Sequence, residues 1–400
     1  MGQDFDVVVV GGGPGGSTAA RLCAQRGMKT LLIEKERFPR YKPCGGCLSQ
    51  KAVRLLGFDL SPVLDRVIET VKFTYCLEDP FFIQSEQPMA FMVMRDRFDH
   101  FLIEKASEER AEILEGEKVV RVEEKAEGVE VELFGGQRLS CQYLIGADGP
   151  ASTVARSLAL GPREISVNGF GLECEIPFQS LNGFSKENLD QLHLNFGQVP
   201  NGYGWVFPKG EGLSIGVGGM LIYKKKTKIQ KCFNDFVGGL SYIQEEKDRK
   251  VIGHLLPSFY DEKQKVARGR VLLVGDAAHL MDPLMGEGIY YAIQSGMMAT
   301  KAILESEEKG ILPTDLYQES VRIHIFENLK WALYFSRFVF QFTRLAYQTL
   351  QRYPELGDLY LQVLGGAESY QSFVIGIKKR MKEFLGGRLS GKIKAAIAKI

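Results

Sequence analysis

The chain has 400 residues, of which 45% are hydrophobic and 25% are charged, and its formal net charge is +1 at pH 7. This length exceeds one ordinary hydrophobic core, so we expect two structural units and an appended tail. The near-zero net charge gives no reason to expect nucleic acid as a partner. No run of about twenty apolar residues occurs, so we expect no transmembrane helix. Seven irregularly spaced cysteines and the lack of a signal sequence predict a reduced, cytoplasmic setting.

The stretch from Asp6 to Glu34 has the pattern of a dinucleotide-binding strand, helix and strand. An apolar β-branched run predicts a buried parallel strand, and Gly11, Gly13 and Gly16 then form G-x-G-x-x-G. In this motif the first glycine makes the tight turn, the second admits a pyrophosphate and the third lets the helix pack closely on the strand. Glu34 ends the second predicted strand, where its carboxylate can accept two hydrogen bonds from a ribose diol. The stretch therefore predicts a site for NAD or FAD, with the phosphates at the helix N-terminus.

A basic loop rich in proline and glycine follows, and it contains Cys44 and Cys47 in C-x-x-C spacing. A zinc site needs two more close ligands, and the chain has no second C-x-x-C and no histidine pair. A dithiol redox pair is a second interpretation. The interpretation that we favour is that small residues lie here because the loop crosses a cofactor. We expect a helix to begin near position 48 or 49 and to end at Gly57.

Residues 66–165 read as strands around one amphipathic helix. The strands are expected at 67–75 and 81–86, joined through Asp79-Pro80, and then at 90–94, 111–114, 119–124, 129–133 and 139–145. Arg95 begins the helix, where it can reach a phosphate or ribityl oxygen, although a solvated helix charge is the alternative. The last strand ends in Ala147-Asp148-Gly149, a second glycine turn at the strand end where open α/β sheets bind ligands.

The texture changes from about residue 167. Strands are expected at 170–176, 192–196, 204–208 and 213–220, followed by a helix at 229–240. They predict a separate antiparallel sheet wide enough to cover a pocket. Tyr203, Trp205 and Phe207 recur at period two, which places them on one face of this sheet, although packing in an ordinary core is the alternative.

The chain then returns to the first unit. A short apolar strand at 271–274 leads to Asp276, and Gly286 and Gly288 open a long helix whose N-terminus suits a polarised carbonyl or a developing anion. Residues 314–352 are expected to be helical. The tail over 377–400 has eight basic residues and one acidic residue interleaved with apolar ones. Such helices commonly lie on anionic membranes, but a solvated helix packed on the protein is an equal alternative.

Three separated motifs together resemble the para-hydroxybenzoate-hydroxylase-like group of FAD enzymes. They are the first glycine motif with Glu34, Gly146-Ala147-Asp148-Gly149, and Gly275-Asp276-Ala277-Ala278-His279. The resemblance implies an α/β (α+β) fold with a Rossmann-like, glutathione-reductase-like FAD domain at 1–65, 93–165 and 265–310. It also implies an inserted antiparallel β-sheet substrate domain at 66–92 and 166–264, and a helical C-terminal region with a basic tail at 311–400.

Finer motifs resemble the geranylgeranyl reductase family, which reduces isolated double bonds of prenyl chains in archaeal lipids, in the chlorophyll side chain and in some quinones. They are Lys42-Pro43-Cys44-Gly45-Gly46, Arg95-x-x-Phe98-Asp99, Tyr203-x-Trp205-x-Phe207-Pro208 and Gly286-Glu287-Gly288-Ile289. The resemblance implies that FAD contacts Gly15, Glu34, Cys44, Gly45, Cys47, Arg95, Val119, Asp276, Gly288 and Ile289. It also implies that Cys44 lies near the reacting centre and that the aromatic motif lines a prenyl channel. Cys47 stands where the family commonly has glycine.

The implied reaction is hydride transfer from reduced flavin to one alkene carbon, while an acid protonates the other. The Cys44 thiol is the candidate acid, with an ordered water as its competitor. The electron donor is NAD(P)H or a ferredoxin, since no second dinucleotide motif occurs. The substrate is a prenylated lipid or quinone, and the tail predicts peripheral contact with the inner face of the membrane. The alternatives are a flavin-dependent monooxygenase or halogenase, and a non-catalytic flavoprotein that acts as a redox or membrane-binding module.

Overall fold

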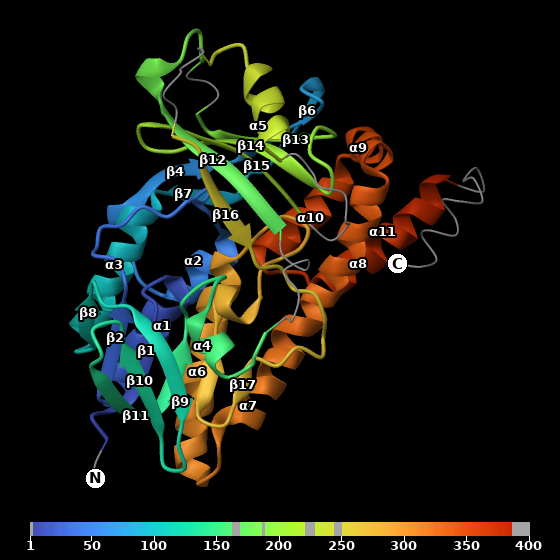
Figure 1. Cartoon of the computed structure of the whole chain (residues 1–400). Coiled ribbons are helices and arrows are strands. Elements are labelled where there is room, and N and C mark those ends of the chain that lie inside the picture. The colour runs from blue at the N-terminus through green and yellow to red at the C-terminus, as the bar shows by residue number, and fades with distance from the viewer. Residues whose placement is uncertain (1–2, 162–168, 186–188, 221–228, 244–249, 386–400) are drawn as a thin grey trace.

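The computed structural model describes residues 3–161, 169–185, 189–220, 229–243 and 250–385, with side chains up to residue 380. Two β-sheets stand one above the other, and the C-terminal helices run along one side of both (Figure 1). Among the described residues, none of the helices combines the length and apolar character that crossing a bilayer requires.

The lower sheet has the expected dinucleotide-binding topology, in the strand order β17-β18-β11-β1-β2-β8. The strands β18, β11, β1, β2 and β8 pair in parallel, while β17 pairs antiparallel to β18 and the β9–β10 hairpin extends the sheet from β11. Val7, Val8 and Val9 are fully buried at its centre, as the apolar run predicted. The strands are β1 (Phe5–Val10), β2 (Thr30–Glu34), β8 (Glu112–Glu115), β9 (Val119–Glu124), β10 (Val129–Leu133), β11 (Arg138–Gly146), β17 (Ala267–Arg268) and β18 (Val271–Leu273).

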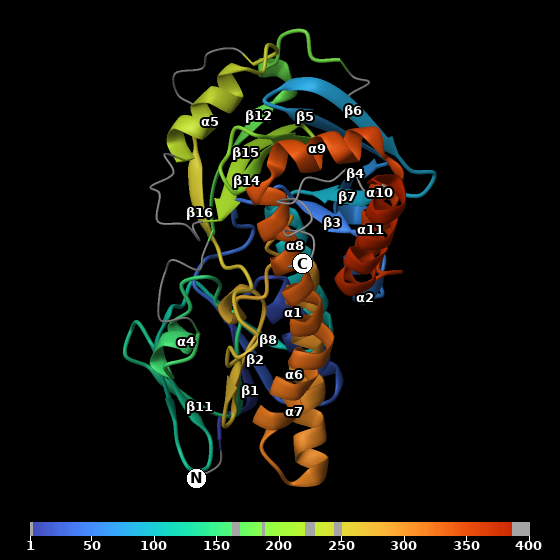
Figure 2. The ribbon, with the colours of Figure 1, turned by 90° about the vertical axis from the view of Figure 1, so that its right-hand side faces the viewer.

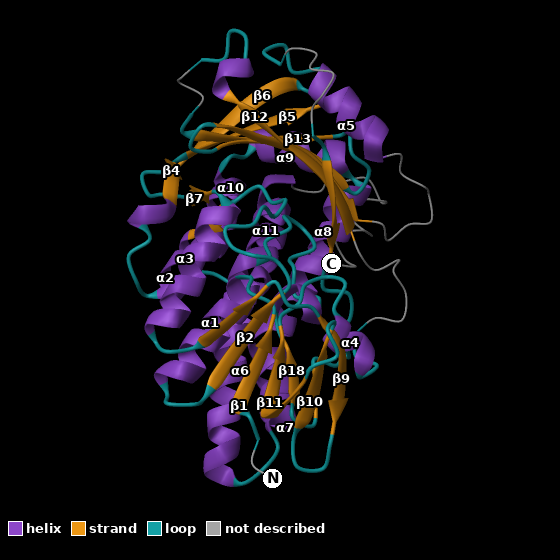
Figure 3. Cartoon of the chain, turned by 60° about the vertical axis from the view of Figure 1, so that its left-hand side comes forward, coloured by secondary structure: helices purple, strands orange, loops and turns teal. Residues whose placement is uncertain are grey.

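Helices flank this sheet (Figure 3). Ser49 caps helix α2 (Gln50–Leu56) by accepting a hydrogen bond from the Ala52 N–H at 3.3 Å. Gly57 ends this helix at φ +70°, as expected. The helices of this unit are α1 (Pro14–Gln25), α2 (Gln50–Leu56), α3 (Arg95–Glu108), α4 (Thr153–Ser157) and α6 (Ile289–Lys309).

The upper sheet is curved and has seven strands, in the order β16-β12-β15-β14-β13-β5-β6. Helix α5 (Ile229–Gly238) covers its outer face and buries Phe233 and Phe236. The prediction of a wholly antiparallel sheet is wrong at one place, because β13 pairs with β5 in parallel. The strands are β5 (Thr70–Tyr75), β6 (Glu78–Gln84), β12 (Gly169–Pro177), β13 (Gln191–Phe196), β14 (Gly202–Pro208), β15 (Gly212–Met220) and β16 (Ile252–Leu256).

The single strand expected at 67–75 is two strands. The first, β4 (Leu64–Ile68), joins a small sheet with β3 (Cys47–Ser49) and β7 (Ala90–Val93), and the chain then crosses to β5. The turn after β5 lies at Cys76 and Leu77 rather than at Asp79-Pro80, because Asn195 accepts a hydrogen bond from the Leu77 N–H at 2.7 Å. Pro80 instead lies in β6, an edge strand, where a missing N–H is tolerated.

The C-terminal helices run from the lower sheet toward the upper sheet and turn beneath it (Figure 2). Tyr347 fixes this position, because its hydroxyl donates to the Phe73 carbonyl of β5 at 3.3 Å. The helices are α7 (Pro313–Val321), a π-helical turn over Arg322–Phe326, α8 (Glu327–Gln341), α9 (Thr343–Arg352), α10 (Glu355–Gly365) and α11 (Tyr370–Leu385). Residues 386–400 of the predicted basic tail lie outside the described residues.

Candidate active site

One cavity of about 1470 Å³ lies between the two sheets, and residues from three parts of the chain line it. Every predicted site residue except Gly16 lines this cavity. Those residues are Gly11, Gly13, Gly15, Glu34, Cys44, Gly45, Cys47, Arg95, Val119, Asp148, Tyr203, Trp205, Phe207, Asp276, Gly288 and Ile289. Their roles remain predictions, but the fold brings together motifs that are far apart in the sequence.

The lower end of the cavity has the shape that a dinucleotide needs. Gly11 has φ +106°, and a Cβ there would lie 2.3 Å from the Ala147 carbonyl oxygen. A Cβ on Gly16 would lie 1.9 Å from the Gly11 carbonyl oxygen, so this glycine packs helix α1 on strand β1. Gly13, in contrast, has no neighbouring atom within 4 Å of an added Cβ, which leaves space for a phosphate at the start of α1.

Glu34 lies at this end as expected, and charged residues surround it. One carboxylate oxygen accepts a hydrogen bond from the Gly12 N–H at 2.8 Å, and Arg40 lies 3.6 Å from the same oxygen. Arg40 also lies 3.0 Å from the Asp99 carboxylate, which is fully buried. The other carboxylate oxygen accepts a hydrogen bond from the Glu36 N–H at 3.2 Å, so the acid is held at the end of β2.

Arg95 is buried, so the alternative of a solvated helix charge is wrong. Its guanidinium donates two hydrogen bonds of 2.8 Å to the Asp99 carboxylate one helical turn away. This bidentate pairing fixes the guanidinium plane. The same guanidinium lies beside the Cys44 thiol, so it joins the lower end of the cavity to the loop above.

Asp148 has a structural role that the motif did not reveal. Its carboxylate accepts hydrogen bonds from the Ser152 hydroxyl and from the Thr153 and Val154 N–H groups, which caps helix α4. Burial raises the pKa of Asp148, and these hydrogen bonds oppose that rise. The Asp148 side chain therefore stabilises helix α4, while the turn that contains it lines the cavity.

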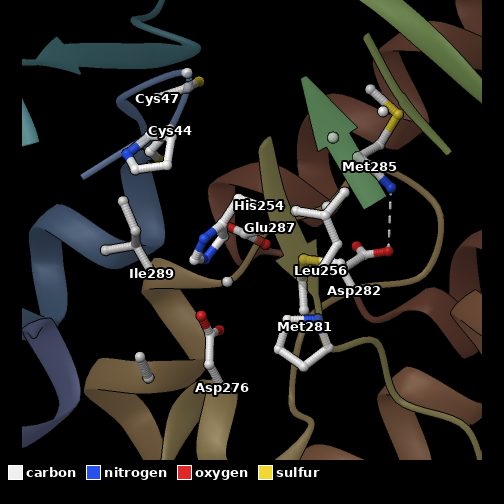
Figure 4. A pocket seen from close by; sticks show the side chains of 18 of the residues that line it. Cys44, Cys47, His254, Leu256, Asp276, Met281, Asp282, Met285, Glu287 and Ile289 are labelled. Atoms are coloured by element: carbon white, nitrogen blue, oxygen red, sulfur yellow. Dashed lines mark hydrogen bonds between the residues drawn. The ribbon is translucent and has the colours of Figure 1, made fainter. Parts of the chain in front are cut away.

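The middle of the cavity carries the imidazole of His254 and the carboxylate of Asp276 (Figure 4). Lys42 Nζ lies 3.8 Å from the Asp276 carboxylate and 3.3 Å from His254 Nε2. Burial lowers the pKa of Lys42 and lowers that of His254 to about 4. The imidazole is therefore neutral at pH 7, and it can accept a hydrogen bond from the lysine.

The loop before α6 presents backbone to the same space. Gly286 has φ +72°, and Gly288 is the N-cap of α6, so free N–H groups of the helix terminus face the cavity. Asp282 fixes the loop by accepting hydrogen bonds from the Leu284 and Met285 N–H groups at 2.6 and 3.3 Å. The Tyr370 hydroxyl of α11 donates to the other oxygen of Asp282, which ties the loop to a C-terminal helix.

The upper end of the cavity is apolar. Tyr203, Trp205 and Phe207 project into it from β14, with ring centroids 6.3 Å apart at each step. The indole of Trp205 lies on β15, where a Cβ on Gly216 would approach it to 2.2 Å. Helices α8 to α11 line the opposite side with Phe335, Phe338, Val339, Phe340, Leu345, Ala346, Tyr347, Leu350, Leu356, Tyr360, Leu361, Leu364, Phe373 and Ile377. We call this upper end the apolar arm.

Two known protein families match the parts of the chain that form the two ends of the cavity. The FAD binding domain family matches residues 4–173 and 261–310, and the geranylgeranyl reductase catalytic domain matches residues 175–256. The chain belongs to the geranylgeranyl reductase family. It is therefore an FAD-dependent oxidoreductase, and the glycine turn, Glu34 and the open space at Gly13 fit that cofactor.

Relatives of this reductase cover most of its length. An uncharacterised protein of Methanosarcina barkeri is 34% identical and covers 93% of each chain. The chloroplastic geranylgeranyl diphosphate reductase of Nicotiana tabacum is 32% identical over 77% of this chain and 68% of its own. A digeranylgeranylglycerophospholipid reductase of Thermoplasma volcanium is 28% identical over 77% and 80%.

Solved structures share the fold. A geranylgeranyl bacteriochlorophyll reductase-like protein of Thermoplasma acidophilum superposes with a TM-score of 0.78 at 24% identity, over 95% of this chain and 98% of its own. A flavin-dependent brominase follows with a TM-score of 0.72 at 20% identity, over 95% and 99%. Similarity at this level concerns the fold alone.

Sequence reasoning missed several charged residues of this reductase that are buried around the cavity. Lys51 lies 2.7 Å from Glu287, and its ammonium stands 4.3 Å from the Tyr290 ring centroid. Asp282 and His254 were also missed, and so was the lining that α8 to α11 contribute. A lone Lys or Asp carries no local signal, because only the partner brought by the fold reveals its role.

Proposed function

We propose that this protein uses reduced FAD to saturate isolated double bonds of prenyl chains carried by a lipid or a quinone. The observation that carries the proposal is that one cavity joins the dinucleotide end to the apolar arm. A prenyl chain offers only hydrophobic area, and burial in an aromatic channel binds it at roughly 25 cal/mol per Å². Relatives named for geranylgeranyl diphosphate and for a digeranylgeranyl phospholipid support this substrate class.

FAD, when bound, supplies the hydride chemistry, and the protein supplies position and exclusion of water. We propose that the turn at Gly11, Gly13 and Gly16 holds the diphosphate and that Glu34 holds the ribose. Arg95, Asp276 and the N-terminal N–H groups of α6 at Gly288 and Ile289 would hold the flavin half. The remaining predicted contacts are Gly15, Cys44, Gly45, Cys47, Val119 and Asp148, all of which line the same cavity.

Within the apolar arm, Tyr203, Trp205 and Phe207 would align the chain so that one double bond reaches the Cys44 loop. The Cys44 thiol remains our candidate for the proton that the second alkene carbon receives, with an ordered water as its competitor. Cys47 is a poor acid here, because desolvation raises the pKa of its thiol to about 12. The dithiol alternative remains open, and both sulfurs are free thiols in the structure.

Anaerobic incubation of the chemically reduced protein with geranylgeranylated lipids and quinones tests the proposal. Mass spectrometry should find products heavier by two hydrogens for each bond reduced. Products that gain oxygen or halogen in air would instead identify a monooxygenase or halogenase, the alternative to which the brominase fold points. Unchanged lipids under all conditions would favour a non-catalytic flavoprotein.

The electron donor and the site of action complete the proposal. We propose NAD(P)H or a ferredoxin as donor, and a cytoplasmic protein that contacts the inner face of the membrane through its basic tail. A lipid substrate supports this location, because a prenyl chain has to leave the bilayer to reach the cavity. Parallel flavin-reduction assays with NADH, NADPH and reduced ferredoxin identify the donor.

A further inference from the structure

We propose that Glu173 and Lys209, two buried charged residues of the upper sheet, are positioning residues that hold Cys44 at the junction between the flavin end and the apolar arm. The inference rests on the proposed function, since it concerns the residue placed nearest the reaction. It assigns a role to two side chains that none of the motifs contains.

Both backbone groups of Cys44 are bonded to these side chains. The Glu173 carboxylate accepts a hydrogen bond from the Cys44 N–H at 2.9 Å and another from the Tyr41 hydroxyl at 2.9 Å. Lys209 Nζ donates to the Cys44 carbonyl at 2.9 Å and to the Glu175 carboxylate at 2.5 Å. We call this set of hydrogen bonds the Cys44 clamp.

The clamp joins two separate parts of the chain. Glu173 and Glu175 are two apart on β12, so they lie on the same face of the sheet, and Glu173 lines the cavity. Lys209 follows β14 on the face that carries Phe207. Cys44, in contrast, comes from the loop after β2 of the lower sheet. The upper sheet therefore holds a loop that belongs to the flavin end of the cavity.

The charged groups of Glu173 and Lys209 are buried, and the hydrogen bonds of the clamp compensate for their burial. Glu173 is 3% exposed and Lys209 is 2% exposed. Burying a charge costs free energy unless it is paired and hydrogen-bonded, whereas an apolar side chain would fill the same space without that cost. Hydrogen bonds to charged groups are roughly twice as strong as neutral ones, so the clamp restrains Cys44 more firmly than an ordinary turn would.

Two glycines let the loop come this close. A Cβ on Gly45 would lie 2.8 Å from the Phe207 ring, and a Cβ on Gly46 would lie 2.1 Å from the Val93 carbonyl oxygen and 3.0 Å from Lys209 Cε. The loop therefore packs directly on the aromatic strand. The position of Cys44 therefore depends on the upper sheet, which lines the apolar arm.

The test measures the Cys44 thiol directly, in the FAD-bound protein without substrate. Lys209→Met removes the donor and keeps most of the side-chain volume, while Lys209→Arg restores a cation. Because a hydrogen bond to a charged group is worth about 1.5–3 kcal/mol, we expect alkylation of Cys44 by iodoacetamide to accelerate about tenfold or more in Lys209→Met. Lys209→Arg should return part of that change, and the exposed thiol of Cys76 should react as before.

Lys72→Met is the matched control, since Lys72 lies on β5 of the same sheet but faces away from the cavity. With any prenyl substrate, Lys209→Met should lower kcat more than it raises KM, while FAD affinity stays unchanged. Equal Cys44 reactivity in Lys209→Met, Lys72→Met and the unaltered protein would overturn the proposal.

A measurement on the unaltered protein covers the case in which Lys209→Met fails to fold. Hydrogen exchange should show the Cys44 amide protected, and Glu173→Gln should increase its exchange because a neutral acceptor binds the N–H more weakly. A Cys44 amide that exchanges as freely as an unbonded loop amide would overturn the clamp. The alkylation and hydrogen-exchange readouts need no prenyl substrate, so failure of the clamp and failure of the proposed function are distinguishable.

Discussion

At the scale of single residues, the site depends on charged groups that the fold removes from water. Asp282, Glu287, Lys51, Arg95 and Asp99 are all buried or nearly so, and each has a partner of opposite charge or a set of hydrogen-bond donors. Such groups make stability sensitive to pH and to the loss of one partner. Two predictions follow from this property.

The first prediction concerns Asp282, whose pKa burial raises to about 6. A carboxyl with a raised folded-state pKa contributes stability that is complete below its unfolded pKa near 3.8 and is lost as the pH rises through about 6. Asp282→Asn cannot ionise, so it should lose this dependence. Between pH 4 and pH 7 the free energy of unfolding of the unaltered protein should fall relative to that of Asp282→Asn by about 2 kcal/mol. Urea denaturation at stepped pH values measures this, and parallel pH profiles for the two proteins would contradict it.

The second prediction concerns the ion pair of Lys51 and Glu287. Lys51→Met leaves a buried carboxylate without its cation, which should cost about 3 kcal/mol of unfolding free energy. Adding Glu287→Gln should recover most of that loss. The control is Lys231→Met, which breaks the exposed pair of Lys231 and Asp235, also 2.7 Å long, and should cost much less unfolding free energy. Equal costs for the two lysines would show that the Lys51 pair does not depend on burial.

At the scale of elements, the agreement between sequence and structure follows how local each signal is. The glycine turn, the buried run of β1, the helix end at Gly57 and the period-two aromatics of β14 were predicted because each is specified within a few neighbouring residues. The division of 67–75 into two strands depends on two different partners, since β4 pairs with β7 and β5 pairs with β13. The parallel pairing of β5 and the turn at Leu77, which Asn195 holds, involve residues more than a hundred positions away. Glu173, Lys209 and Lys51 were missed for the same reason.

Helix α6 supports the dinucleotide turn from behind, and this contact gives the third prediction. A Cβ on Gly296 would lie 2.5 Å from the Gly15 carbonyl oxygen, a backbone atom that cannot rotate away. Gly296→Ala should therefore push α6 from α1 and weaken FAD binding about tenfold or more, as expected for a strained contact of 1–3 kcal/mol. Gly238→Ala is the control, since no atom lies within 4 Å of its added Cβ. Fluorescence titration with FAD compares them, and unchanged affinity in Gly296→Ala would contradict the account.

At the scale of the whole molecule, three parts of the chain together form the cavity between the two sheets. The lower sheet forms the dinucleotide end, the upper sheet forms one wall of the apolar arm, and α8 to α11 form the other. The sequence predicted the first two from motifs. It did not predict the third, because aromatic residues at helical spacing look the same in a core as in a cavity wall.

The tail gives the fourth prediction, on membrane contact. Sedimentation with vesicles of anionic phospholipid should recover more of the full chain than sedimentation with vesicles of neutral phospholipid. Salt at 0.5 M should release the bound protein, because screening then limits the attraction between charges to a range of roughly a few ångströms. Replacing Lys392, Lys394 and Lys399 by Gln should reduce binding, whereas replacing Lys231 and Lys301 by Gln should not. Equal binding of both variants would place the contact elsewhere.

The central claim is that the apolar arm delivers a prenyl double bond to the flavin end. Its most direct test is the anaerobic rate at which the reduced protein is reoxidised by a geranylgeranylated lipid, with the fully saturated form of the same lipid as control. We expect the unsaturated lipid to accelerate reoxidation and the saturated lipid to leave the rate unchanged. Trp205→Ala should lose most of the acceleration while retaining FAD. Equal rates with both lipids, across a panel of prenylated lipids and quinones, would contradict the claim.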